Sequence, residues 1–212
     1  MQVTEPVAIP RAPVELPLRT RTPDGWAEAA LTDTLALLDD HAHLERKAAS
    51  NAMELMTRWP NPEPPSPNWT VVLSAIARDE ADHLHKVCKL LFARGAQMSR
   101  GHANPYARSL RNLVRMGQGQ EELVDRLMVS AMIELRSCER FEVLGRVCED
   151  PVLLKLYRGL WGSEHNHYRV FLRLATHFEP RKKVMARWDQ MLDDEAAILA
   201  AQAPGPRMHS GF

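Results

Sequence analysis

Four long stretches of the sequence place apolar side chains at three- and four-residue spacing, and each stretch is interrupted near its middle by a glutamate. This spacing is typical of one face of an α-helix, and such a face is normally buried. The interrupting residues are Glu45, Glu80, Glu134 and Glu164. Because buried carboxylates are costly and repel one another at short range, a fold that brings these four together must also neutralise them.

Two of the four glutamates are followed by a histidine three residues later: His83 follows Glu80, and His167 follows Glu164. On a helix this spacing puts both side chains on one face, about a turn apart, so that both reach the same metal ion. Two divalent cations balance four carboxylates, and two neutral imidazoles complete the ligand set. One Glu from each of two helices and Glu-x-x-His from each of the other two is the pattern of ferritin-like di-iron and di-manganese proteins. The predicted metal ligands are therefore Glu45, Glu80, His83, Glu134, Glu164 and His167.

The positions of the prolines outline an all-α fold. All 15 prolines fall in expected loops, at helix starts, in the leader or in the tail, because a helix interior does not accept proline cheaply. We expect a short helix at about 23–31 that runs or bends into a long helix ending near Trp59, followed by helices at about 68–94, 105–116, 120–148, 151–178 and 181–200. The predicted class is a ferritin-like four-helix bundle with additional short helices. Its domains are an extended leader at 1–22, the bundle at 23–200 with a stiff proline-rich loop at 60–67, and a flexible tail at 201–212.

Length and composition restrict the class of protein. The 212 residues suit one domain, and the formal net charge of zero gives no sign of a nucleic-acid or membrane partner for the molecule as a whole. The three cysteines stand singly, without a CxxC pair, which indicates a reducing compartment and argues against disulfides or a rubredoxin-type iron site. The N-terminus lacks the apolar core of a signal peptide, and no apolar run is long enough to span a bilayer. A cytoplasmic enzyme without a membrane partner is expected.

The types of ligand also bear on the metal. Carboxylates with some imidazole suit iron or manganese, which this set does not distinguish, and the absence of thiolate argues against structural zinc. His41 lies one turn before Glu45, either as an outer partner of the metal site or as a plain core or capping histidine. Asp79 is expected either to hold a metal-bound histidine from outside or to be a solvated surface residue.

Four segments of the sequence resemble the MiaE-type tRNA hydroxylases, a ferritin-like di-iron family. They are DDHAHLERKAASNAMELM (39–56), RDEADH (78–83), IELRSCERF (133–141) and SEHNHY (163–168). The resemblance covers roughly residues 22–200, and the leader and proline-rich loop have no clear match. It implies O2-dependent hydroxylation of the isopentenyl group of 2-methylthio-N6-isopentenyladenosine, the base next to the anticodon in certain tRNAs. It also implies two iron ions, held by the six predicted ligands, with O2 as co-substrate.

One part of the chain has a charge pattern that, together with this resemblance, favours an RNA partner. From Leu84 to Gln120 the sequence contains no acidic residue, although the net charge of the chain is zero. We expect this block to form a basic rim for tRNA phosphates, or alternatively a solvated face that pairs with acidic neighbours such as Asp189, Asp193 and Asp194. Tyr106, within the block, is expected either to stack on a base or to pack against the bundle. The cations of the block are Lys86, Lys89, Arg94, Arg100, Arg108, Arg111 and Arg115.

Other functions on the same bundle remain open from the sequence. It contains no glycine-rich dinucleotide fingerprint and no haem or iron–sulfur cysteine motif, so a hydroxylase would need an external reductase. The alternatives are a ferroxidase or iron-handling protein, a di-metal oxidase of a lipid or other small apolar substrate, and a non-enzymatic bundle. The sequence makes no prediction of oligomeric state.

Overall fold

The computed structural model describes residues 15–58 and 68–212. Within these two ranges no extended strand forms, and the β-type pairing is limited to an isolated bridge between Pro204 and Gly211. The predicted all-α class is confirmed. The helices are α1 (Asp24–Leu31), α2 (Thr34–Leu55), α3 (Trp69–Ala93), α4 (Pro105–Arg111), α5 (Gln120–Val147), α6 (Pro151–Ala175) and α7 (Arg181–Ala200).

Local capping chemistry fixes where several helices begin and end. The side chain of Asn104 accepts a hydrogen bond from the backbone N–H of Ala107 at 3.0 Å, and a proline opens helix α4. Asp150 does the same for α6, accepting from the N–H groups of Val152 and Leu153 at 2.8 and 3.2 Å. Both caps use otherwise unsatisfied N–H groups of the first helical turn. Gly95 follows α3 with a φ of 77°, a conformation that favours glycine at a helix end.

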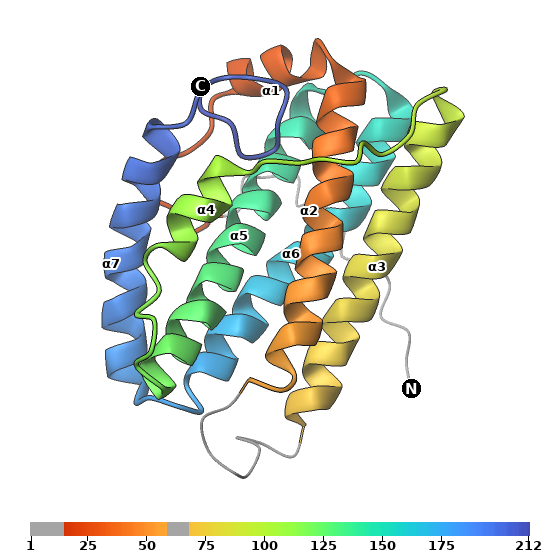
Figure 1. The fold of residues 1–212 in the computed structure, drawn as a ribbon. Helices are drawn as coiled ribbons and strands as arrows, with labels where there is room; N and C mark the ends of the chain where they lie inside the picture. The colour runs from red at the N-terminus through yellow and green to blue at the C-terminus, as the bar shows by residue number, and fades with distance from the viewer. Residues whose placement is uncertain (1–14, 59–67) are drawn as a thin grey trace.

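The four long helices form the bundle. Helix α2 packs along α3 and α5 packs along α6, and contacts between α3 and α6 join the two pairs (Figure 1). Helices α1, α4 and α7 contact α5 from outside the four-helix core. Helix α5 is therefore the central element, which explains why most of its charged residues are buried along with its apolar ones.

Several predicted boundaries differ from the structure. Helix α2 ends at Leu55, and Trp59 and the proline-rich loop at 60–67 lie outside the described residues. Helix α4 ends at Arg111 rather than near 116, and α6 ends at Ala175 rather than near 178. Helix α1 begins without a side-chain cap, and the nearby hydroxyl of Thr22 donates to Glu139 at 2.7 Å in a tertiary contact.

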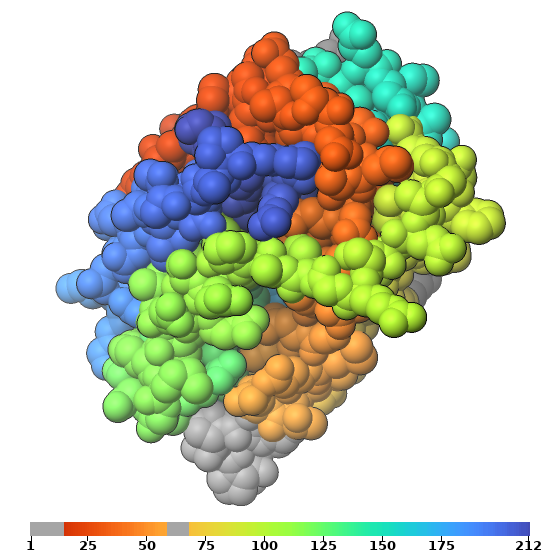
Figure 2. All heavy atoms as spheres, turned by 45° about the horizontal axis from the view of Figure 1, so that its top comes forward, coloured from red at the N-terminus to blue at the C-terminus, as the bar shows by residue number. Residues whose placement is uncertain are grey.

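The C-terminal segment, predicted to be a flexible tail at 201–212, is instead packed into the protein. Met208, His209 and Ser210 are buried. Figure 2 shows this segment lying between the N-terminal helices and the stretch that leads into α4. The backbone N–H of Met208 donates to the carboxylate of Asp40 at 2.9 Å. The prediction was wrong because proline and glycine break a helix but do not prevent tight packing of an irregular segment.

The described part of the leader also contacts the bundle. Leu16 and Leu18 are buried in the core, whereas residues 1–14 lie outside the described part of the chain. Arg19 pairs with Asp189 and Asp193 on α7. Among the described residues, none of the helices combines the length and the apolar character that a bilayer span requires.

Candidate metal centre

The six predicted ligands converge inside the bundle. Each long helix contributes at least one of them, and each of the six residues is at least 95% buried. Two groups form, and within each group one ligand atom per residue lies within 4.8 Å of the others. Glu80 and Glu164 belong to both groups, so these two carboxylates lie between the two candidate positions. One group is Glu45, Glu80, His83 and Glu164, and the other is Glu80, Glu134, Glu164 and His167.

The ring nitrogens of the two histidines face these carboxylates. Nδ1 of His83 lies 3.3 Å from Glu164, 3.4 Å from Glu80 and 3.7 Å from Glu45. Nδ1 of His167 lies 2.6 Å from an oxygen of Glu80. The two imidazole rings are 6.3 Å apart between centroids.

Many of these buried atoms form no hydrogen bond of good geometry. Both carboxylate oxygens of Glu80, one of Glu164 and Nδ1 of both histidines have no hydrogen-bond partner among the described residues. Native proteins rarely leave so many buried polar atoms unsatisfied at one place. One ligand atom from each residue of a group lies within 4.8 Å of the others, which is close enough for both groups to hold a metal ion. The residues therefore fit a metal site.

The electrostatics of the cluster show the same need for positive charge. Burial and the neighbouring carboxylates of Glu164 and Glu80 raise the pKa of Glu134 well above its ordinary value. Burial lowers the pKa of His167, but contacts with Asp79 and Glu80 outweigh that effect and raise the pKa to about 10. Without metal cations, the raised pKa values favour the protonated forms of Glu134 and His167, and these protons reduce the net negative charge of the cluster. Divalent cations neutralise the same charge when those protons leave.

His41 and Asp79, the two residues predicted as possible outer partners of the metal site, both contact the cluster. His41 Nε2 donates to a carboxylate oxygen of Glu45 at 2.5 Å. Burial alone would raise the pKa of Glu45, but this bond and the contact with His83 lower it to about 2. Asp79 lies 3.5 Å from Nε2 of His167, on the side of the ring away from Glu80. Such contacts orient an imidazole or carboxylate toward a metal.

Comparison with known proteins identifies the family. The sequence model of the tRNA-(ms2io6A)-hydroxylase (MiaE) family matches residues 10–210. The chain is also 37% identical, over 90% of both chains, to the tRNA 2-(methylsulfanyl)-N(6)-isopentenyladenosine(37) hydroxylase of Pseudomonas putida. The chain belongs to the MiaE family. The protein of the same name from Salmonella typhimurium is 30% identical over 64% of this chain and 49% of its own length.

A solved structure has the same fold as this MiaE-family chain. It is described as protein 43 with aldehyde deformylating oxygenase activity from Synechococcus. The TM-score is 0.83 and the sequence identity is 32%, over 92% of this chain and 96% of that chain. The predicted ferritin-like bundle is thereby confirmed, because this oxygenase has the ferritin-like fold.

A pocket between α2, α4 and α5 connects the metal cluster of the MiaE-family chain with its surface. Glu134 forms part of its wall, together with the apolar side chains of Leu44, Ala48 and Ile133. The wall also contains three cations, Lys47, Arg111 and Arg126. This lining could not be predicted from the sequence, because the pocket forms only where α2, α4 and α5 meet.

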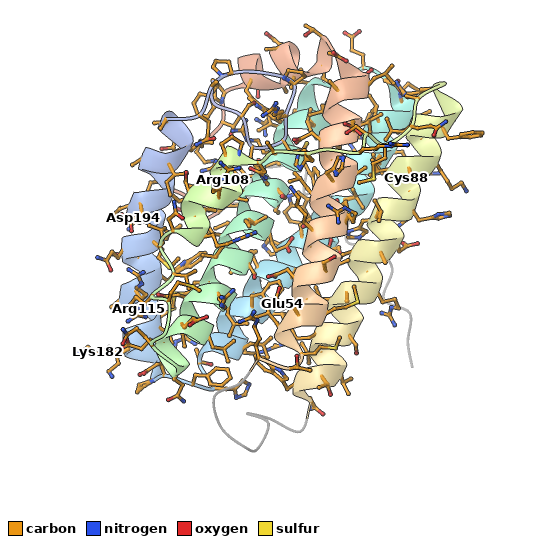
Figure 3. The ribbon with its side chains drawn as sticks, in the orientation of Figure 1. Glu54, Cys88, Arg108, Arg115, Lys182 and Asp194 are labelled. Atoms are coloured by element: carbon orange, nitrogen blue, oxygen red, sulfur yellow. The ribbon has the colours of Figure 1, made fainter. Side chains whose placement is uncertain are left out.

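Some cations of the predicted basic block are paired with acidic residues. Three of its seven cations are paired: Lys86 with Asp82 at 2.6 Å, Arg94 with Asp150 at 2.5 Å and Arg115 with Asp125 at 2.8 Å. Figure 3 places Arg108 on α4 and Cys88 on α3, with α2 between them in this view. No ion pair with another described residue is recorded for Lys89, Arg100, Arg108 and Arg111.

Tyr106 packs inside the protein and is not placed to stack on a base. Its side chain is fully buried, and its hydroxyl donates to Glu195 on α7 at 2.9 Å. Of the two interpretations of Tyr106, packing against the bundle is therefore the correct one. The acidic residues Asp189 and Asp193, considered as partners of the basic block, pair with Arg19 instead.

Proposed function

We propose that this chain is an O2-dependent di-iron hydroxylase of the isopentenyl group of 2-methylthio-N6-isopentenyladenosine in tRNA, at the base next to the anticodon. The observation that carries the proposal is the pocket that leads to Glu134 of the buried carboxylate–imidazole cluster. Membership of the MiaE family and the name of the Pseudomonas putida relative support the choice of substrate. A tRNA substrate also agrees with the cytoplasmic location that the sequence predicts.

The proposed ligands of the two iron ions are the six predicted residues. Glu80 and Glu164 are the proposed bridging carboxylates, because both belong to each of the two groups of ligand atoms. His41 and Asp79 are positioning residues that hold Glu45 and His167. Manganese fits the same ligands, so bound metal must be identified directly. The full set is Glu45, Glu80, His83, Glu134, Glu164 and His167.

The chemistry divides between the metal and the protein. When bound, a pair of iron ions supplies the reduction of O2 and the oxidation of a C–H bond of the isopentenyl group, for which no side chain suffices. The apolar wall of Leu44, Ala48 and Ile133 excludes water and suits an isopentenyl group close to Glu134. Electrons come from a separate reductase, because the sequence contains no motif for a redox cofactor of its own.

The Synechococcus structure favours a second candidate, the deformylation of an apolar aldehyde at the same centre. An aldehyde fits the apolar part of the pocket equally well. The three cations in the pocket wall favour RNA, since an aldehyde carries no charge to match them.

A direct assay separates the two candidates. The iron-loaded protein, with a chemical reductant and O2, is incubated with tRNA that carries the prenylated base, and the nucleosides are examined by mass spectrometry. We expect a gain of about 16 mass units, one oxygen atom, on that nucleoside and none on tRNA lacking the prenyl group. Turnover of a long-chain aldehyde without change in the tRNA would replace our proposal with the second candidate.

Metal analysis tests the ligand assignment. We expect Glu80→Ala and Glu164→Ala to lose most of the bound iron, since each removes a carboxylate common to both positions. Glu54→Ala is the matched control: this glutamate lies on α2 like Glu45, but its side chain is 53% exposed and pairs with Arg58 (Figure 3). Full iron content in the Glu80 and Glu164 variants would show that the ligands are wrong.

A further inference from the structure

Lys47 occupies an unusual position in the pocket wall. Its side chain lines the pocket that contains Glu134, and its Nζ lies 2.7 Å from Nδ1 of His102. His102 belongs to the segment that connects α3 with α4, so it reaches Lys47 from another part of the chain. A lysine side chain at a pocket is usually mobile, whereas that of Lys47 is held by its hydrogen bond to His102.

The hydrogen-bond directions of this contact follow from the chemistry of the ammonium group. Lysine has only donors, so Nδ1 of His102 must accept, which leaves the imidazole proton on Nε2. His102 Nε2 then donates to a carboxylate oxygen of Asp40 at 2.7 Å. The other oxygen of Asp40 accepts from the backbone N–H of Met208. Lys47, His102 and Asp40 thus form one hydrogen-bonded chain that ends in the buried C-terminal segment.

The ring of His102 is fixed in a second way. It stacks on the ring of His43, with centroids 4.7 Å apart and an angle of 7° between the planes. His43 in turn contacts the hydroxyl of Ser99 at 3.0 Å. The side chain of Lys47 is therefore held by a histidine that is itself fixed by stacking and hydrogen bonding.

The charges around the pocket indicate what Lys47 binds. Arg126 is paired with Glu122 at 2.8 Å, but no ion pair with another described residue is recorded for Arg111. The carboxylate that faces the pocket is Glu134, which belongs to the metal cluster. Neither Lys47 nor Arg111 pairs directly with a carboxylate of the described residues, so both present positive charge to whatever enters, which suits an anionic group.

We propose that Lys47, together with Arg111, binds a phosphate oxygen of the RNA backbone next to the modified base, and that His102 and Asp40 position Lys47 for this contact. This inference rests on the proposed function. Phosphate contacts fix the register of a nucleic acid on a protein, so this one directs the prenyl group toward Glu134. Holding the lysine in advance reduces the entropy lost when it binds, since a free lysine side chain loses much rotamer freedom on ordering.

The first experiment measures RNA binding by Lys47→Met. The probe is an anticodon stem-loop RNA carrying the prenylated adenosine, added to the iron-loaded protein without O2 and titrated at several salt concentrations. We expect about tenfold weaker binding, because one charge-assisted hydrogen bond is lost. The slope of log affinity against log salt should decrease by about 0.7, as for one single-strand phosphate contact. Lys182→Met, which removes an exposed lysine on α7 at the outer edge of the molecule (Figure 3), is the control and should bind like the wild type.

Turnover of the same RNA separates binding from chemistry. We expect Lys47→Met to raise KM about tenfold with kcat and iron content unchanged, and Lys47→Arg to restore most of the affinity. Wild-type binding, salt slope and KM in Lys47→Met would overturn the inference. A fall in kcat with loss of iron would also overturn it, because Lys47 would then act through its neighbour Glu45.

His102→Phe tests the positioning role. Phenylalanine keeps a ring that stacks on His43 but removes both hydrogen bonds. We expect KM to rise in the same direction as in Lys47→Met, with a smaller effect and unchanged kcat; an unchanged KM would remove His102 from the proposal. The proposed function fails separately, if the wild type binds this RNA but never hydroxylates it.

Discussion

At the scale of single residues, Gly211 shows how closely the C-terminal segment is packed. A Cβ atom at this position would lie 2.0 Å from the backbone carbonyl oxygen of Gln202. No L side chain fits there unless the backbone of one of the two segments moves. A glycine near the end of a chain is thus a packing requirement here.

We expect Gly211→Ala to reduce the free energy of unfolding by about 1–3 kcal/mol, as in other overpacked sites. Urea denaturation measures the change. Gly159→Ala is the control, because Gly159 lies in α6 and its Cβ would meet nothing within 4 Å. That variant should be neutral or more stable by about 0.5–1 kcal/mol, since alanine favours a helix. Equal stability of both variants would show that the segment is loose.

Asp40 makes stability depend on pH. Burial raises the pKa of Asp40, but the hydrogen bonds from His102 and the N–H of Met208 outweigh it, so the pKa lies below its ordinary value of 3.8. The folded protein therefore keeps the carboxylate where the unfolded chain is already protonated. This stabilisation is complete above the ordinary pKa and is lost as pH falls through the lower, folded value.

We therefore expect wild-type protein to lose more unfolding free energy than Asp40→Asn between about pH 5 and about pH 3. Urea denaturation of both proteins at the two pH values gives this difference. Parallel losses would mean that Asp40 does not contribute to acid sensitivity.

At the scale of helices, a buried ionic network joins α5 to α7 and α4. The guanidinium of Arg136 donates two hydrogen bonds to Glu195, each 2.9 Å long, and a third to Glu139 at 3.1 Å. Tyr106 donates to the same Glu195. Burial and the carboxylate of Glu195 raise the pKa of Tyr106 and outweigh the opposite effect of Arg136, so the hydroxyl remains a neutral donor. The network holds the outer helices against the central one.

We expect Glu195→Ala to lower the free energy of unfolding by about 3 kcal/mol, because it leaves a buried guanidinium with too little negative charge. Glu54→Ala, at an exposed ion pair, should change it by less than about 1 kcal/mol. Thermal or urea denaturation of the two variants makes the comparison, and similar small effects would contradict a structural role of this network.

At the scale of the whole molecule, the metal cluster joins the two helix pairs. Helix α2 packs along α3 and α5 along α6, and the six side chains bring residues of all four helices together. Cations that bind these side chains only in the folded state must stabilise that state. Without them, repulsion between the carboxylates opposes the association of the pairs.

We expect chelation of the metal to lower the Tm by about 5–10 °C, from about 2.7 kcal/mol at a hundredfold excess over Kd and the size of this domain. Differential scanning calorimetry with and without iron measures the shift. Glu80→Ala should show little dependence on iron, because it lacks a carboxylate common to both positions. A metal-dependent shift of equal size in this variant would contradict the assignment.

The order of the long helices and the meeting of the six predicted ligands inside the bundle could both be predicted from the sequence. Helical periodicity and capping are local, so the spacing of Glu80 and His83, or the Asp150 cap of α6, is visible without a structure. The positions of the carboxylates on apolar faces also follow from the sequence, since a bundle must bury those faces.

The tertiary structure alone decided which residues outside that pattern matter. His102 lies 62 residues from Asp40, and Met208 lies 168 residues from it, so no local pattern relates them. The packing of the C-terminal segment, the pairing of Arg94 and Arg115 and the pocket beside Lys47 likewise depend on which surfaces meet. Side chains at a helix–helix contact are selected by the geometry of both partners, and that geometry exists only in the folded chain.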